Sequence, residues 1–320
     1  MSLEVIYVVR HGFRSNWRGD PMLGDDAPPQ PRLPTGNAAD PALSDYGIIQ
    51  SRELAAHLTK NTGSAMPVER MYCSPYYRCL ETVQPLVNTM TEADGGKTKE
   101  VVRCEPGLVD WFGPLPFKHP QPLPAAELRD RFFPWIDAAY IPSVGGPSPE
   151  GESMAQLHAR LAAVVGSIVR QCDAEGVRSV LLCTHAAPII ALGRVLTGQV
   201  PADVGAEDFG VFTCGLTTYR RRQQPPVAID PSTIFSWDDP QKILSTQTWT
   251  HGRGVGGGWD CAVSCDCSFL SGGEERGWKF SADDEDPATL ERRRNDTVVD
   301  SGLELGVVVK GRTKRVTAST

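Results

Sequence analysis

Val5-Ile6-Tyr7-Val8-Val9-Arg10-His11-Gly12-Phe13-Arg14 is the stretch of sequence that decides the fold. Its first five residues are apolar and mostly β-branched, which predicts a strand buried on both faces of a sheet. The strand ends in Arg-His-Gly-x-Arg, so two guanidinium groups flank one imidazole at the end of the strand where α/β sheets bind ligands. Gly12 lets the backbone approach a ligand closely, and guanidinium groups make paired contacts with phosphate. The stretch therefore predicts an anion site at His11, and the plainer alternative is a surface histidine between two solvated arginines.

The composition predicts a reduced, non-membrane protein. The chain has 320 residues, of which 40% are hydrophobic, enough for one large α/β domain or for a domain with an appendage. A net charge of -7 argues against non-specific binding to nucleic acids or membranes. We expect no signal peptide and no membrane-spanning segment. Nine cysteines, mostly isolated in apolar runs, favour the cytoplasm or the nucleus.

Three further segments put polar residues at the ends of predicted strands. The run 68–73 leads to Ser74-Pro75-Tyr76-Tyr77-Arg78, and the run 101–104 leads to Glu105. The run 177–183 leads to Thr184-His185, and a predicted helix with Pro188 in its first turn follows. His185 thus lies next to a helix N-terminus, where an anion is favoured. For each residue the plainer alternative is a solvated or structural side chain.

Taken together, these motifs resemble the histidine phosphatase superfamily. Arg-His-Gly-x-Arg, Ser-Pro-x-x-Arg, Glu-x-x-Leu-x-Asp-Trp and Thr-His occur in the order of the family, and Leu-Ser-x-x-Gly-x-x-Gln-Ser-x-x-Leu begins at Leu43. The family more often has glycine where this chain has Ala186. The resemblance covers about residues 3–221. It implies an α/β three-layer sandwich with a mostly parallel central sheet and helices on both faces.

The resemblance also implies a phosphatase reaction in which His11 becomes a phosphohistidine. The residues that would hold the phosphate oxygens are Arg10, Arg14, Arg78 and His185, and Arg10 and His185 also belong to the implied catalytic set. Surrounding arginine charge lowers the pKa of an imidazole, which favours the unprotonated, attacking form of His11. No metal ion and no cofactor is expected, because the arginines supply the positive charge. The sequence also has no P-loop and no Gly-x-Gly-x-x-Gly fingerprint.

Two acids are candidates for the proton donor. The family pattern Glu-x-x-Leu-x-Asp-Trp begins at Glu105, and its first acid is taken as the donor to the leaving group. Asp110 is the rival, because it is also acidic and lies near the same turn. Loop carboxylates are more often solvated than catalytic, so the motif alone leaves both open.

Two Pro-rich loops are expected to form the walls of the pocket. Residues 15–43 follow the first motif directly, and residues 112–150 are rich in proline and aromatic residues. The second loop is interpreted as a cap on the substrate side. Its aromatic residues fit ordinary packing equally well.

Two other functions are alternatives to a free phosphatase. Phosphoglycerate mutases carry Arg-His-Gly-Glu-Ser at the nucleophile, whereas this chain has Phe13 and Arg14, which argues against a mutase. Within the superfamily the chain looks like two branches, the suppressor-of-T-cell-receptor-signalling phosphatases and the fungal histidine-phosphatase subunit of transcription factor IIIC with its free-standing relatives. The segment 266–278 looks like the fungal branch. An assembly role in an RNA polymerase III factor is therefore the alternative to a free enzyme.

The composition and pattern of the sequence change after Arg222. We predict a histidine phosphatase domain over 1–222 and a β-rich C-terminal extension over 223–320, with strands near 242–249 and 303–309 that extend the main sheet or pair together. The expected partners are a phosphorylated small molecule or phosphoprotein and, through 223–320, a protein. Neither a membrane nor direct binding to nucleic acid is expected. The residues that could form a zinc site in the extension are His251, Cys261, Cys265 and Cys267, but their spacing lacks the Cys-x-x-Cys knuckle, so no zinc is predicted.

Overall fold

The computed structural model describes most of the chain. The described residues are 2–24, 27–60, 66–93, 95, 102–114, 118–203, 205–222 and 248–281, together with the backbone of Val307–Val309. Most of the strand predicted over 242–249 lies outside these residues.

Strands and helices alternate through the first two thirds of the chain. The strands are β1 (Val5–Arg10), β2 (Arg70–Cys73), β3 (Val102–Cys104), β4 (Ser179–Thr184), β5 (Leu216–Arg221), β6 (Trp259–Asp266), β7 (Gly277–Lys279) and β8 (Val307–Val309). The helices are α1 (Asp45–Thr59), α2 (Tyr77–Ala93), α3 (Ala125–Arg131), α4 (Met154–Glu175) and α5 (Ala186–Thr197), with 3-10 turns η1 (Pro106–Leu108) and η3 (Val255–Gly257).

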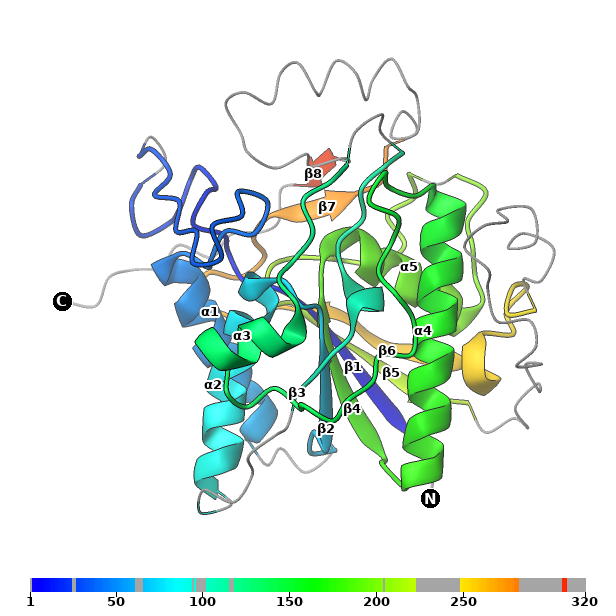
Figure 1. Cartoon of the computed structure of the whole chain (residues 1–320). Coiled ribbons are helices and arrows are strands. Elements are labelled where there is room, and N and C mark those ends of the chain that lie inside the picture. Colours follow the sequence, from blue (N-terminus) through cyan, green and yellow to red (C-terminus); the bar gives the residue numbers. More distant parts are fainter. Residues whose placement is uncertain are drawn as a thin grey trace.

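The main sheet is mostly parallel and covered on both faces. Within the described residues it has six strands in the order β3-β2-β4-β1-β5-β6. The strands β3, β2, β4 and β1 pair in parallel, and β5 is antiparallel to both β1 and β6. Helices α4 and α5 cover one face, and α1, α2 and α3 lie on the other (Figure 1). The predicted three-layer α/β fold is confirmed.

Alternation along β1 explains why this strand is central. Ile6 and Val8 belong to the core beneath α4 and α5. Val5, Tyr7 and Val9 belong to the second core, beneath α1 and α2. Because both faces are buried, the whole strand has to be apolar, and the first polar residues appear where it leaves the sheet.

The strand register brings the carboxyl ends of four strands to one edge. Arg10 pairs with Thr184 at the ends of β1 and β4, and Cys73 pairs with both Cys183 and Cys104. The residues that follow these strands therefore emerge side by side. This is the end of an open α/β sheet where ligands bind.

Two glycines let the first motif pack tightly against α1. A methyl group added to Gly12 would lie 2.9 Å from the carbonyl oxygen of Gly47, and one added to Gly47 would lie 2.3 Å from that of Phe13. Ser44 caps α1 by accepting from the N–H of Gly47, and the N–H of Phe13 donates to Gln50 Oε1 at 3.0 Å. The Leu-Ser-x-x-Gly-x-x-Gln pattern is thus the surface that holds the Arg-His-Gly turn.

The C-terminal extension contributes to the sheet. Strand β6 pairs with β5 as the edge strand, and it was not predicted from the sequence. Strand β5 begins at Leu216, after a turn at residues 213 and 214. Strand β8, inside the predicted run 303–309, pairs with β7. The boundary at residue 222 stays a prediction. No helix in the described ranges is long and apolar enough to cross a membrane.

Candidate active site

His11 lies at the centre of the polar edge. The residue is 2% exposed, and its backbone N–H donates to the carbonyl of Thr184 at the end of β4. Its Nδ1 lies 2.8 Å from the carbonyl oxygen of Gly12. A carbonyl only accepts, so Nδ1 carries the proton and Nε2 is left with its lone pair.

Arg10 and Arg14 lie around one aromatic ring. Their guanidinium carbons are 5.5 Å and 5.1 Å from the centre of the Trp17 ring, which itself lies 5.8 Å from the ring of His11. Arg10 Nη1 donates to the carbonyl of Val211 at 2.7 Å, and Arg14 Nε donates to Asn16 Oδ1 at 3.2 Å. Both side chains are buried, and the predicted wall 15–43 does line the site through Trp17.

Arg78 is the most deeply buried of the three guanidinium groups. Its Nη1 donates to the carbonyl of Ala39 at 3.1 Å and lies 3.4 Å from Asp40 Oδ1, and its Nη2 donates to Asp110 Oδ2 at 3.2 Å. Its guanidinium carbon lies 4.4 Å from the centre of the Tyr76 ring. Arg78 Nε is buried and has no hydrogen-bond partner within the described residues. That N–H is a donor that an anion in this site would satisfy.

His185 connects Arg78 to β2. Its Nδ1 lies 3.1 Å from Arg78 Nη2, and its Nε2 lies 2.8 Å from Ser74 Oγ. Because a guanidinium only donates, Nδ1 is the acceptor and Nε2–H donates to Ser74. The rings of His185 and His11 are 5.3 Å apart between centroids. The structure thus brings together the five residues from three predicted motifs: Arg10, His11, Arg14, Arg78 and His185.

Burial and the arginine charges set the protonation states. The pKa of His11 lies well below its usual range because of burial first, and then because of Arg78 and the other two guanidinium groups. Burial, followed by the charge of Arg78, has the same effect on the pKa of His185. Burial raises the pKa of Asp110, while Arg78 acts in the opposite direction. Both imidazoles are therefore neutral, and the carboxyl is closer to its protonated form than a solvated aspartate.

The structure does not bring Glu105 into this group. Its side chain is fully buried, and its Oε1 accepts from the N–H of Gly107 at 3.0 Å. Its Oε2 accepts from the hydroxyl of Tyr140 at 2.5 Å and from that of Ser143 at 3.2 Å. Asp110, by contrast, has its Oδ2 3.4 Å from His185 Nδ1, and its side chain is 24% exposed.

A buried ion pair supports the segment that carries Asp110. Arg160 on α4 donates through Nε to both carboxylate oxygens of Glu152, at 3.1 Å and 3.0 Å. Its Nη1 donates to the carbonyls of Gly107 at 2.6 Å and Val109 at 3.1 Å. Trp111 Nε1 donates to the carbonyl of Glu152 at 2.9 Å. Glu152 and its partner Arg160 therefore fix the turn on both sides of Asp110.

Sequence reasoning missed several supporting residues. Asp40 and Trp17 lie in the loop that was expected to line the pocket, but neither was singled out. Ser74 opens the Ser-Pro motif at the end of β2, which was the available signal. Arg160 lies on the buried face of α4. Its position there was the available signal, because a fully buried arginine needs a carboxylate partner.

The predicted cap over 112–150 is partly core. Phe133 and Trp135 are buried in the core cluster beneath α2, and Tyr77 packs edge-on against Phe132 at 5.3 Å. Phe112 stacks on His119 at 4.3 Å. Covering the substrate stays a prediction for this loop.

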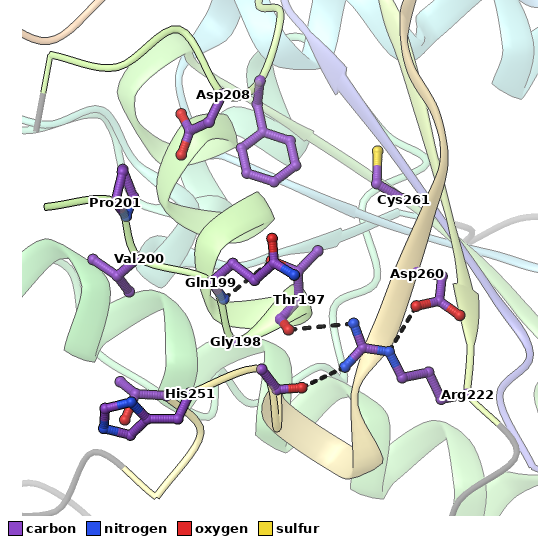
Figure 2. A pocket seen from close by; sticks show the side chains of 13 residues that line it. Thr197, Gly198, Gln199, Val200, Pro201, Asp208, Arg222, His251, Asp260 and Cys261 are labelled. Atoms are coloured by element: carbon purple, nitrogen blue, oxygen red, sulfur yellow. Dashed lines mark hydrogen bonds and ion pairs between the residues drawn. The ribbon is translucent and has the colours of Figure 1, made fainter. Parts of the chain in front are cut away.

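A separate hollow of about 890 Å³ lies at the opposite end of α5 (Figure 2). Its charged groups are paired within the protein, since Arg222 donates to Asp260 Oδ1 at 2.7 Å and Arg194 donates to Asp208 Oδ2 at 2.7 Å. His251 and Cys261 line it. The other two residues weighed as zinc ligands pack elsewhere, in a small core cluster with Cys214. Among the described residues no three His, Cys, Asp or Glu side chains form a metal-ligand set, and zinc content stays untested.

A family comparison agrees with the fold. The model of the histidine phosphatase superfamily (branch 1) matches residues 6–229. Among solved structures, the ecdysone phosphate phosphatase from Bombix mori in complex with tungstate superposes with a TM-score of 0.52 at 20% identity, over 73% of this chain and 98% of that one.

Two curated relatives are described by different functions. The chain is 30% identical over 288 residues to the transcription factor tau 55 kDa subunit of Saccharomyces cerevisiae, covering 88% of this chain and 59% of that protein. It is 27% identical over 218 residues to the ecdysteroid-phosphate phosphatase of Drosophila melanogaster, covering 61% of this chain and 27% of that protein. The chain therefore spans less than two thirds of either relative.

We predict that Arg160→Met lowers the free energy of unfolding by about 3–5 kcal/mol, because it leaves the carboxylate of Glu152 buried without its partner. The measurement is urea unfolding. Adding Glu152→Leu should recover a good part of the loss, since the stranded charge is then removed. The matched control is Arg131→Met in the exposed pair with Glu127, which should change stability by about 0.5 kcal/mol or less. A similar small loss for Arg160→Met would contradict the role of this pair.

Proposed function

Because this chain belongs to branch 1 of the histidine phosphatase superfamily, we propose that it hydrolyses phosphomonoesters through a phosphohistidine formed on His11. The observation that carries the proposal is the hydrogen bond from His11 Nδ1–H to the carbonyl of Gly12. It presents an unprotonated Nε2 beside three guanidinium groups. A nucleophile needs that lone pair, and a phosphate dianion needs that positive charge.

In the first step Nε2 of His11 forms a bond to phosphorus while the bond to the leaving oxygen breaks. Arg10, Arg14 and Arg78 hold the equatorial oxygens as negative charge spreads over them. The unsatisfied Nε–H of Arg78 supports this role. His185 orients Arg78 through its Nδ1. Direct contact between His185 and phosphate, expected from the family resemblance, stays a prediction.

We assign the proton donor to Asp110 in preference to Glu105. Asp110 faces Arg78 and His185, and burial raises the pKa of its carboxyl, a shift in the direction that a proton donor needs. The carboxylate of Glu105 is committed to Gly107 and Tyr140 on the other side of the turn. A donor has to reach the leaving oxygen, and this geometry supports Asp110 over Glu105.

In the second step water attacks phosphorus and the bond to Nε2 breaks. The Asp110 carboxylate takes a proton from that water, inorganic phosphate leaves, and His11 regains its lone pair. The proposed reaction needs no metal ion, since the guanidinium groups offset the charge of the phosphate. The substrate class is a phosphorylated small molecule or phosphoprotein.

His11→Ala should reduce hydrolysis of an aryl phosphate to below about 1% of the native rate, because the nucleophile is lost. The thermal melt should stay close to that of the native protein. Each assay is run with and without a metal chelator, and the native rate should not change. A variant with native-like activity would falsify the nucleophile assignment, and chelator-sensitive activity would overturn the metal-free mechanism.

Asp110→Asn should slow esters with poor leaving groups by about 10²–10⁴-fold and activated aryl esters far less, because only the former need a proton. Glu105→Gln is the matched control, since it changes a neighbouring buried acid of the same turn. It should alter stability more than the dependence on the leaving group. The reverse pattern would return the role of donor to Glu105.

A subunit of an RNA polymerase III transcription factor is the second candidate function. The observation that favours it is the likeness to the tau 55 kDa subunit. That match covers 88% of this chain, so it extends beyond residue 222 into the C-terminal extension. In this case residues 223–320 would take part in assembly, and the protein would be nuclear. A free enzyme fits the cytoplasm as well as the nucleus.

Gel filtration of native extract distinguishes the two candidates. A free enzyme should elute at the volume of the purified recombinant chain, and a subunit should elute far earlier. Phosphatase activity measured across the same fractions shows whether the catalytic site works inside a complex. Elution of the entire pool as a single chain would contradict the assembly role.

A further inference from the structure

The C-terminal extension reaches the catalytic edge through its backbone. Arg10 Nη1 donates to the carbonyl of Arg276 as well as to that of Val211, although Arg276 lies 266 residues later in the chain. The neighbouring contact is of the same kind, since the N–H of Thr213 donates to the carbonyl of Glu275 at 3.0 Å. The segment before β7 is therefore fixed against the guanidinium that begins the Arg-His-Gly motif.

The side chain of Arg276 lies one aromatic ring away from the nucleophile. Its guanidinium carbon is 4.9 Å from the centre of the Trp17 ring and 5.3 Å from that of Phe13. The Trp17 ring lies 5.8 Å from the ring of His11. Arg276 Nη2 donates to the carbonyl of Arg18, in the loop that lines the site. Cation–π contact and this hydrogen bond hold the guanidinium in a fixed place beside Trp17.

Arg276 adds a further positive group to the site. Arg10, Arg14 and Arg78 surround His11, and all three are proposed to hold the phosphate. Arg276 is partly exposed, and in the described part of the chain it forms no ion pair. The adjacent Glu275 has a carboxyl whose pKa is raised by burial, with Arg276 as a smaller opposing effect.

The backbone of Arg276 determines which substitution can test its side chain. Its φ is +54°, in the left-handed region that glycine adopts more easily than any L-residue. Replacing Arg276 with glycine therefore removes the guanidinium without straining the backbone.

We propose that Arg276 is a specificity-determining residue that selects phosphomonoesters with a second anionic group near the ester. The proposal rests on the proposed phosphatase function. The guanidinium groups of Arg10, Arg14 and Arg78 would take the phosphate, and that of Arg276 would bind the second anion by a charge-assisted hydrogen bond. A substrate without this group would be hydrolysed with a higher KM.

The test compares 4-carboxyphenyl phosphate with its methyl ester, which removes the second charge and keeps the phosphate and the ring. The native protein should favour the acid. Arg276→Gly suits the left-handed backbone and retains the carbonyl that holds Arg10, so it should fold as well as the native chain. It should raise KM for the acid about tenfold with kcat nearly unchanged, and change the methyl ester less than about twofold. Arg276→Lys should retain part of the preference.

His251→Gly is the matched control, because His251 has a φ of +58° and lines the hollow at the far end of α5. It should change neither substrate. Equal losses on both substrates in Arg276→Gly would overturn the inference and leave Arg276 a scaffold role, and so would no loss on either. A native protein inactive on both esters would instead refute the proposed phosphatase function. Native activity without a preference for the acid would overturn this inference alone.

Discussion

Burial of the Arg78 guanidinium is the constraint on which the arrangement of the site depends. A guanidinium that is 1% exposed loses its hydration and is tolerated only when acceptors surround it. Those acceptors come from separate parts of the chain: Asp40 from the loop after β1, Asp110 from the turn after β3, and His185 from the end of β4. Meeting the needs of one charge therefore fixes three segments relative to each other. The neighbouring helix α2, which carries Arg78, is fixed with them.

Much of the fold follows from the sequence because burial acts on every residue of a strand. The run that became β1 is apolar up to Arg10, the runs that became β2 and β4 are apolar over 71–73 and 180–183, and polar residues follow each of them at once. Helices α1 and α4 carry caps at Ser44 and Ser153 and glycine or polar residues at their ends. Strand β6 was not predicted because the adjacent apolar residues Ala262 and Val263, both exposed, interrupt the alternation of apolar and polar residues. Its pairing with β5, which includes register shifts, makes it a strand.

The residues of the candidate site that could be predicted lie in motifs at the end of a strand. His11 and His185 each come one residue after a strand, so the register of β1 and β4 places them together. Glu105 also comes directly after a strand, yet it caps η1 and points into the protein, whereas Asp110 faces the site from beyond the turn. The direction of a short turn depends on tertiary contacts, here those of Arg160. Arg276 was beyond prediction for the same reason, because its position depends on contacts made across most of the chain.

Burial shifts the pKa values of both His11 and Asp110 in the direction that the proposed reaction needs. Removal from water disfavours the charged form of any titratable group. For His11 this lowers the pKa and leaves a neutral ring with a lone pair, and the arginine charges act in the same direction. For Asp110 it raises the pKa and favours the protonated acid, against the pull of Arg78. A single buried edge thus favours an unprotonated nucleophile and a protonated donor at the same pH, and the bound phosphate dianion would strengthen the second effect by offsetting the arginine charge that opposes it.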